Sequence, residues 1–405
     1  MTRKDILAAR ERLAGVALHT PLVYSRTLSR LAGAEVFLKL ENLQTTGSFK
    51  LRGALNRLAL LKERGEGRRV VAASAGNHGQ AVAFAAALLG LEAVIVMPEG
   101  ASLSKQLAAQ GYGATVLLHG RDLAQALQRA QELVREGYVF IHPFDDPEVM
   151  AGQGTLGLEI REDLPGVEAV LLPVGGGGLA AGVAVALKEE SPGVRLVGVQ
   201  TAQVPSLPAA LAHGAPTPVT ARETLADGIR VPLTGGHPFA ILKRLLDEVV
   251  LVEEGEIAQA VLLLLESKKV LAEGAGAVTT AALLGPLAGR NLGNRLVVVV
   301  SGGNMDIPLL ERVLVRALLL KGRLLTLTVV LPDRPGSLGR LAGLVGEQQA
   351  NILHLFHDRM ARDLPLDFTR VELHLETRSA EHGRQVCAAL AEAGYQIHYG
   401  PVREG

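Results

Sequence analysis

The sequence has 405 residues with 41 basic and 41 acidic side chains, so its formal net charge is zero and indicates no nucleic acid, acidic surface or membrane as a partner. Hydrophobic residues make up 48% and charged residues 20% of the chain, which is typical of a globular protein with a large core. The single cysteine, Cys387, excludes an internal disulfide framework and suits a reducing compartment.

The start of the chain predicts a charged amphipathic helix over residues 1–15 rather than a signal peptide. The most apolar stretch, residues 81–97, is interrupted by Gly90 and Glu92, and no run reaches the length of a membrane span. We therefore expect a cytoplasmic protein without membrane association.

A lysine in an unusual place marks the first candidate site. Residues 36–38 are an apolar run typical of a strand, and a helical pattern follows a glycine turn at Gly47. Lys50 then falls in the first helical turn, where the positive end of the helix dipole disfavours a cation. A lysine kept neutral there is a good nucleophile for a carbonyl, including a cofactor aldehyde. Alone, Lys50 would be better explained as a solvated lysine, so the functional interpretation depends on motifs downstream.

From residue 70 onward, short apolar strands alternate with glycine turns and helices. The strands are expected at residues 70–73, 93–96, 114–118, 139–141, 169–172, 195–199 and 295–300. This alternation predicts parallel α/β sheets covered on both faces. We expect one catalytic domain over residues 1–320, built as two lobes, with a smaller lobe of about residues 50–150 inserted within it.

Four consecutive glycines, Gly175, Gly176, Gly177 and Gly178, stand between a predicted strand and a predicted helix. Successive N–H groups can point at one anion there, and the helix N-terminus adds a favourable field. A flexible turn is the alternative, although four glycines in a row are entropically costly. The run predicts a phosphate site. It is no Walker loop, because no Lys-Ser/Thr follows, and no dinucleotide fingerprint, because the next strand runs into Gln200.

A second domain is expected from the change in composition at Lys321. A strand-like run over residues 324–331 is followed by a helix ending near Glu347 and two more strand-like runs at 351–357 and 367–376. A helix over 380–393 and a short strand at 395–399 complete the pattern. This βαββαβ order predicts a ferredoxin-like domain over residues 321–405.

Asn77 and Ser301 each follow a predicted strand, where open α/β sheets bind ligands, although either alone is more often a turn or cap residue. With the other motifs they resemble the pyridoxal-phosphate-dependent threonine dehydratases (threonine ammonia-lyases) of the tryptophan-synthase-β-like, fold type II group. The resemblance covers roughly residues 2–320 in matching order and is carried by residues 41–44, 47–54, 74–80, 175–179 and 301–304.

The resemblance implies a role for each motif. Lys50 would hold the aldehyde of pyridoxal 5′-phosphate (PLP) as a Schiff base and act as the base on the substrate Cα–H. Asn77 would form a hydrogen bond with the 3′-oxygen of the ring, and the Ser301 hydroxyl would lie at the pyridine nitrogen. The implied cofactor-binding set is Lys50, Phe49, Asn77, Gly175, Gly176, Gly177, Gly178, Leu179 and Ser301, and the implied substrate-binding set is Ser74, Ala75, Gly76 and His78.

Several other residues have two interpretations. His78 is more readily a positioned hydrogen-bond partner than a catalytic acid. Glu273 either approaches the ring or caps a helix. Asp227 and Gly228 are expected in a wall of the site. His142, His237 and the histidines of the ferredoxin-like domain lack metal-ligand spacing and are better explained as structural, so no metal is expected.

Ala75 bears on the reaction. Serine racemases look similar over the same span but place a serine at this position as a second acid/base, whereas Ala75 has no proton to give. We therefore expect α,β-elimination converting L-threonine to 2-oxobutanoate and ammonia, with L-serine as a slower substrate. A serine/threonine racemase of the same fold and a non-catalytic amino-acid sensor are the alternatives.

The C-terminal domain resembles the ACT domains that bind small amino acids. The resemblance implies a homo-oligomer, a dimer or tetramer, in which isoleucine or valine regulates a step toward isoleucine. The effector would lie where the loop holding Pro335 and Gly336 faces Asn351 on the next strand. A purely structural role in joining subunits is the alternative.

Overall fold

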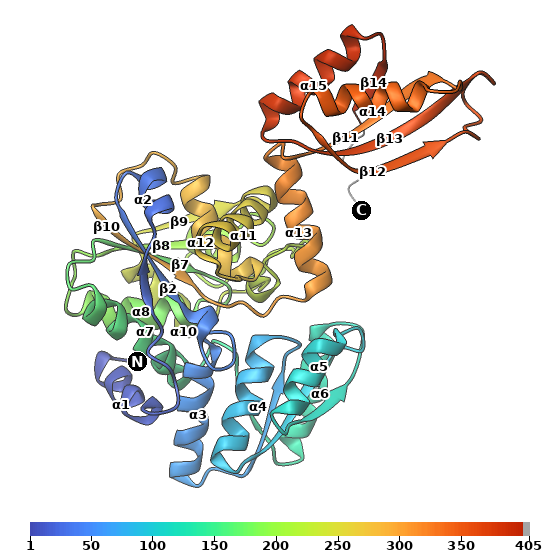
Figure 1. Ribbon diagram of the computed structural model, residues 1–405. Coiled ribbons are helices and arrows are strands. Elements are labelled where there is room, and N and C mark those ends of the chain that lie inside the picture. The colour runs from blue at the N-terminus through green and yellow to red at the C-terminus, as the bar shows by residue number, and fades with distance from the viewer. Residues whose placement is uncertain (400–405) are drawn as a thin grey trace. The chain divides into compact units, whose positions relative to one another are not determined.

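The computed structural model describes residues 1–399. The chain forms two compact units, Met1–Ile307 and Pro308–Gly405 (Figure 1). Among the described residues, no helix is long and apolar enough to cross a membrane.

The larger sheet of the first unit has six strands in the order β1-β2-β10-β7-β8-β9. Every pairing is parallel except that of β1 with β2. Its central strands are continuous runs of valine and leucine because both faces are covered. The strands are β1 (Leu22–Tyr24), β2 (Glu35–Leu40), β7 (Ala169–Pro173), β8 (Arg195–Thr201), β9 (Glu248–Val252) and β10 (Arg295–Val300).

Four helices, α7, α8, α9 and α10, pack on one face of this sheet in one apolar core, whereas α12 contacts the same strands without joining that core. Helices α7 and α8 lie so close together that a Cβ on Gly182 would be only 2.7 Å from the backbone nitrogen of Gly154. Glycine at these positions therefore permits the close packing. The elements are α1 (Arg3–Leu13), α2 (Arg26–Ala32), α7 (Pro147–Asp163), α8 (Gly178–Lys188), α9 (Ser206–His213), α10 (Gly236–Leu245), α11 (Glu254–Lys268), α12 (Gly274–Leu284) and the short 3₁₀ turns η1 (Glu41–Leu43) and η2 (Asp227–Ile229).

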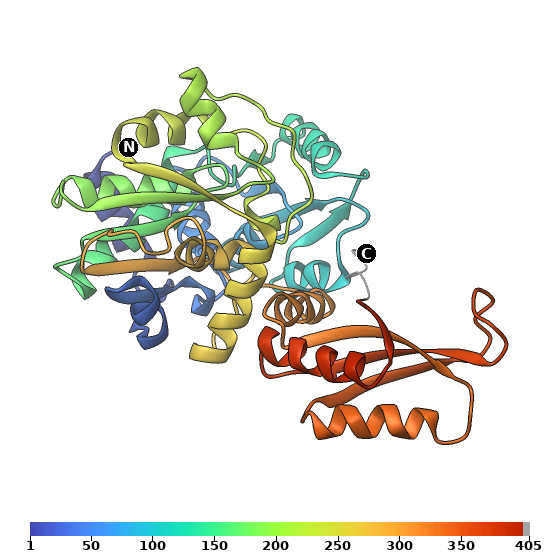
Figure 2. The same ribbon diagram turned by 90° about the horizontal axis from the view of Figure 1, so that it is seen from above.

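A second, four-stranded parallel sheet in the order β5-β4-β3-β6 forms the smaller lobe. Alternate residues of β3 face opposite layers: Val70 packs with α3, α4 and α5, whereas Val71 packs with α6. This sheet and its helices, in blue to cyan, can be followed in Figure 2. The two-lobed parallel α/β architecture is therefore confirmed. The elements are α3 (Lys50–Arg64), β3 (Arg69–Ala73), α4 (Asn77–Leu89), β4 (Glu92–Met97), α5 (Leu103–Gly111), β5 (Thr115–Leu118), α6 (Leu123–Arg135) and β6 (Val139–Phe140).

The second unit contains an antiparallel sheet in the order β12-β13-β11-β14, which confirms the predicted βαββαβ succession. Leu341 and Val386, one from each helix, join the buried side chains of β11 and β13 in one core. The elements are α13 (Ile307–Leu320), β11 (Leu324–Pro332), α14 (Ser337–Glu347), β12 (Asn351–Asp358), β13 (Phe368–Glu376), α15 (Ala380–Glu392) and β14 (Gln396–Tyr399).

The strand register corrects one expectation about this unit. Asn351 and Leu324 both pair with Glu376, whereas Pro332, at the other end of β11, pairs with Phe368. Because α14 carries the chain back along the sheet, β12 runs parallel to β11. Within one copy of the chain, Asn351 therefore lies at the opposite end of the sheet from the loop that follows β11, and the prediction that it faces this loop is wrong.

Candidate active site

Lys50 is the first residue of α3, where the sequence predicts it. Phe49 is the N-cap, and its N–H donates to the carbonyl of Ser301 at 3.1 Å. The Nζ of Lys50 donates to the carbonyl of Pro143 at 2.9 Å. Burial lowers the pKa of Lys50 to about 8, against the opposing effect of Glu273. A lower pKa leaves more of the amine neutral, and the neutral amine is the nucleophile.

The glycine run leads from β7 into α8. Gly177, at φ +95°, is the N-cap and Gly178 the first helical residue. Over the described residues 1–399, the backbone N–H groups of residues 175–179 have no hydrogen-bond acceptor. A row of free N–H donors at a helix N-terminus is suited to an anion such as phosphate.

The segment of Pro143 and Phe144 connects Lys50 with the glycine run. Pro143 accepts from Lys50, and the next residue packs on two of the glycines. A Cβ on Gly176 would lie 2.3 Å from the Phe144 ring, and one on Gly178 would lie 2.8 Å from the Phe144 carbonyl oxygen. Side chains on the run would therefore displace the segment against which Lys50 is held.

Asn77, the first residue of α4, is held between two other side chains. Its Nδ2 donates to Glu273 Oε1 at 2.7 Å, and its Oδ1 accepts from Asn304 Nδ2 at 2.8 Å. Glu273 makes no side-chain capping bond to α12, which supports its interpretation as a residue of the site. Burial, followed by the charge of Asp227, raises the pKa of Glu273 to about 8.

A small cavity adjoins this group. Asp227 and Gly228, which were expected in a wall of the site, both line it. Lys105, from α5, donates to Asp227 Oδ2 at 3.1 Å. Sequence reasoning gave no role to Lys105, Gln80 or Asn304. Lys105 lies far along the chain from the other residues of the cavity, whereas Gln80 and Asn304 stand within the motifs 74–80 and 301–304, where their side chains were not considered. The full lining is Gly76, Asn77, Gln80, Lys105, Asp227, Gly228, Glu273 and Asn304.

The loop before α4 holds the remaining predicted residues. Ser74 Oγ accepts from the Gly76 N–H at 3.2 Å, while the N–H groups of Ala75, Asn77 and His78 have no acceptor within the described part of the chain. His78 Nε2–H donates to a backbone carbonyl at 2.9 Å. Burial, then the charge of Lys50, lowers the His78 pKa to about 3. A neutral, hydrogen-bonded imidazole supports positioning rather than proton donation.

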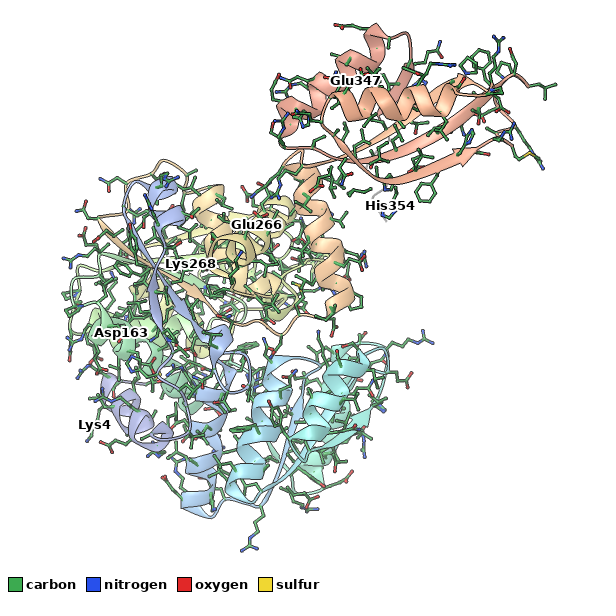
Figure 3. The ribbon with its side chains drawn as sticks, viewed as in Figure 1. Lys4, Asp163, Glu266, Lys268, Glu347 and His354 are labelled. Carbon is green, nitrogen blue, oxygen red and sulfur yellow. The ribbon has the colours of Figure 1, made fainter. Side chains whose placement is uncertain are left out.

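Arg52 anchors the start of α3 through a buried ion cluster. Its Nε and Nη2 donate to the two oxygens of Glu41, each at 2.8 Å. Its Nη1 and Nη2 donate to Glu159 on α7 at 2.5 and 2.9 Å. Lys39 Nζ extends the cluster to Glu159 at 2.8 Å and to Asp163 at 3.0 Å (Asp163 is labelled in Figure 3). The cluster joins the first turn of α3, where Lys50 lies, to η1 and α7.

Comparison with known proteins identifies the family. The profile of the family described as "Pyridoxal-phosphate dependent enzyme" matches residues 14–302. The chain is 47% identical over 398 residues to the L-threonine ammonia-lyase of Thermotoga maritima, covering 98% of this chain and 99% of that protein. The chain belongs to the threonine ammonia-lyase family of PLP-dependent enzymes.

Solved structures agree with this assignment. A threonine deaminase isoform from Solanum lycopersicum aligns with a TM-score of 0.73 at 36% identity, covering 78% of this chain and 92% of that one. A serine racemase from Dictyostelium discoideum aligns at 0.71 and 36%, covering 76% of this chain and 99% of that one. Threonine ammonia-lyases and serine racemases thus share this fold, and the fold alone does not select the reaction.

The residues of this threonine ammonia-lyase family member fit PLP. The free N–H groups of residues 175–179 suit its phosphate, and the partly buried Lys50 amine, with its lowered pKa, suits its aldehyde. The hydroxyl of Ser301 is buried, with only a long contact of 3.4 Å to a backbone carbonyl, so it can turn toward another partner. Among residues 1–399, no group of three or more His, Cys, Asp or Glu is arranged to hold a metal ion.

Proposed function

We propose that this protein catalyses the α,β-elimination of water from L-threonine and so releases 2-oxobutanoate and ammonia. The observation that carries the proposal is the 47% identity to the L-threonine ammonia-lyase of Thermotoga maritima along 98% of the chain. The low pKa of Lys50 and the free N–H donors of the glycine run support it.

We assign the cofactor contacts to the predicted residues. When bound, PLP supplies an electron sink for the negative charge left on the substrate Cα. The N–H groups of residues 175–179 would neutralise the phosphate, Lys50 would bond the aldehyde, and the Asn77 N–H would donate to the ring oxygen. The Ser301 hydroxyl can donate to an unprotonated ring nitrogen, whereas a carboxylate would favour protonation. The weaker sink that results favours loss of the β-hydroxyl over return of the proton to Cα.

The residues of this chain move the proton on one face of the substrate. The free N–H groups of the loop holding Ala75 and His78 would receive the substrate carboxylate. Once the substrate amine has replaced it on the aldehyde, the free Lys50 amine would take the Cα proton. The electron pair of that bond would form the Cα–Cβ double bond as the β-hydroxyl leaves, and the proton taken up by Lys50 can be passed to that oxygen, so that water departs. The released enamine takes up water and loses ammonia, which gives the keto acid. L-serine, which lacks the γ-methyl group, is proposed as a slower substrate.

The position of Ala75 favours elimination over racemisation. Racemisation needs a second group that delivers a proton to the other face of Cα, and a methyl side chain has none. Recovered threonine should therefore keep its configuration while keto acid accumulates. Substantial D-allo-threonine after partial turnover, the product of inversion at Cα alone, would favour the racemase alternative.

The test is a keto-acid assay on the purified protein with PLP. L-threonine should give 2-oxobutanoate, and the protein should show the visible absorbance band of bound PLP. Lys50→Ala should lose that band and nearly all turnover, while Lys62→Ala, on an exposed turn of the same helix, should keep both. No band and no keto acid from the wild-type protein would contradict the proposal.

We further propose that the second unit is an ACT-like regulatory domain that binds isoleucine or valine in a cytoplasmic homo-oligomer. Gly336, at φ +83°, forms the turn into α14, where such a ligand would lie. Gly336→Ala strains that turn, whereas Gly343→Ala lies within α14 with no atom within 4 Å of the added Cβ. Calorimetric titration of the full chain should show effector binding lost in the first variant only, and an absence of heat with the wild type would leave the structural alternative.

A further inference from the structure

The amide of Asn304 has only one possible orientation. Its Nδ2 lies 2.8 Å from the carbonyl oxygen of Thr46, 2.8 Å from Asn77 Oδ1 and 3.3 Å from Gln80 Oε1. A backbone carbonyl can only accept a hydrogen bond, so the atom of Asn304 that faces Thr46 must be the NH₂ group. The group that faces Asn77 is therefore always a donor.

This donor determines how Asn77 is turned. Because Asn304 donates, the side of Asn77 facing it must be the oxygen, and Nδ2 then points to Glu273 at 2.7 Å. Glu273 cannot set this orientation itself, since burial raises its pKa to about 8 and a protonated carboxyl can donate or accept. Nδ2 carries two hydrogens, of which Glu273 takes one. The other remains for a ligand.

We propose that Asn304 is a positioning residue that keeps the N–H face of Asn77 turned toward the ring oxygen of PLP. The proposal rests on the assignment of Asn77 to that oxygen under the proposed function. If Asn77 were reversed, its carbonyl oxygen would face an oxygen of the cofactor, and an attractive contact would become a repulsive one.

The same side chain ties together parts of the site that lie far apart in sequence. Asn304 follows β10 of the larger sheet, Asn77 and Gln80 lie on α4 of the smaller lobe, and Thr46 precedes the turn that carries Lys50. The fit is close, because a Cβ on Gly47 would lie 2.2 Å from Asn304 Oδ1. One amide thus sets Asn77 in relation to both the larger sheet and the Lys50 turn.

The test compares two substitutions that separate hydrogen-bond donation from packing. Asn304→Asp keeps the size but removes the donor, so Asn77 turns its N–H toward the new carboxylate and its oxygen toward PLP. Asn304→Ala removes both the donor and the volume, and it leaves Asn77 able to turn either way. The dissociation constant of PLP is measured for the full chain by titration of the absorbance band, together with the melting temperature of the PLP-free protein.

The expected result is that Asn304→Asp weakens PLP binding by roughly 10- to 100-fold and weakens it more than Asn304→Ala does. A packing role predicts the reverse order, because alanine leaves the larger gap. Asn291→Asp is the matched control, since Asn291 is exposed and its Oδ1 accepts from a turn N–H, as a carboxylate also can. The control should bind PLP as the wild type does.

Each outcome has a defined meaning. An alanine variant that binds PLP as weakly as the aspartate variant, or more weakly, would overturn the role of Asn304. Should Asn304→Asp not fold, Asn304→Leu replaces it as a variant of similar volume without a donor, and wild-type affinity in that variant would likewise overturn the role. A wild-type protein that fails to bind PLP would instead overturn the proposed cofactor site itself.

Discussion

Arg52→Met should strongly destabilise the first unit. The Arg52 side chain is 1% exposed and donates to Glu41 and Glu159, which are 0% and 8% exposed. Methionine keeps an apolar stem but leaves the carboxylates without their cation, and removing one partner of a buried ion pair costs about 3–5 kcal/mol. With an unfolding entropy of about 2.1 cal/mol/K per residue over Met1–Ile307, the melting temperature should fall by about 5–8 °C.

The loss should depend on pH. Burial by itself raises the pKa of Glu41. The charge and hydrogen bonds of Arg52, with smaller effects of the Thr20 hydrogen bond and the Lys39 charge, outweigh burial and hold the pKa below its ordinary value of 4.5. In the wild type, the stability from Glu41 is therefore present above pH 4.5 and is lost as pH falls through the lower, folded-state pKa. In the variant, burial is opposed only by the Thr20 hydrogen bond and the charge of Lys39, so the folded-state pKa of Glu41 should rise above 4.5 and stability should be lost as pH rises above that value. The difference between the two proteins should widen from pH 5 to pH 8.

Scanning calorimetry of the full chain at these two pH values measures the difference. Arg10→Met is the control, because the Arg10–Glu162 pair lies at 2.5 Å with both side chains about half exposed, and such pairs contribute at most about 1 kcal/mol. A melting temperature for Arg52→Met no lower than that of Arg10→Met would refute the reasoning. A difference from the wild type that is equal at both pH values would refute the role given to Glu41.

Three further predictions concern the site. In Gly176→Ala, the added Cβ would lie 2.3 Å from the Phe144 ring, and relieving that overlap should cost about 1–3 kcal/mol. The cost should appear as weaker PLP binding, and an unchanged affinity would contradict the prediction. Burial, then Asp227, raises the pKa of Glu273 to about 8, so the wild type should lose stability as pH rises from 4.5 to 8. Glu273→Gln should flatten that decline in thermal melts. Lys105→Met removes a partly exposed ion pair with Asp227, so the free energy of unfolding should change by less than about 1 kcal/mol. The KM for threonine should rise, and an unchanged KM would exclude Lys105 from the site.

The sequence was a good guide where neighbouring residues set the structure. The position of Lys50 in the first turn of α3 follows from a glycine turn and a helical repeat that are contiguous in the chain. The place of the glycine run between β7 and α8 follows in the same way. Between Gln200 and Arg295, however, the sequence reasoning gave no bounds for any helix or strand and suggested only that Glu273 could cap a helix. The structure has α9, α10, β9, α11 and α12 there.

What the sequence by itself determined is therefore the alternation of strands and helices, the type of site and the family. Only the tertiary structure decided which distant residues meet. Asn304 reaches Asn77 across 227 residues, and Asn351 lies away from the loop it was expected to face, because these placements depend on strand order and register. Local periodicity and glycine geometry are properties of adjacent residues, whereas strand order follows from how all apolar faces are buried together.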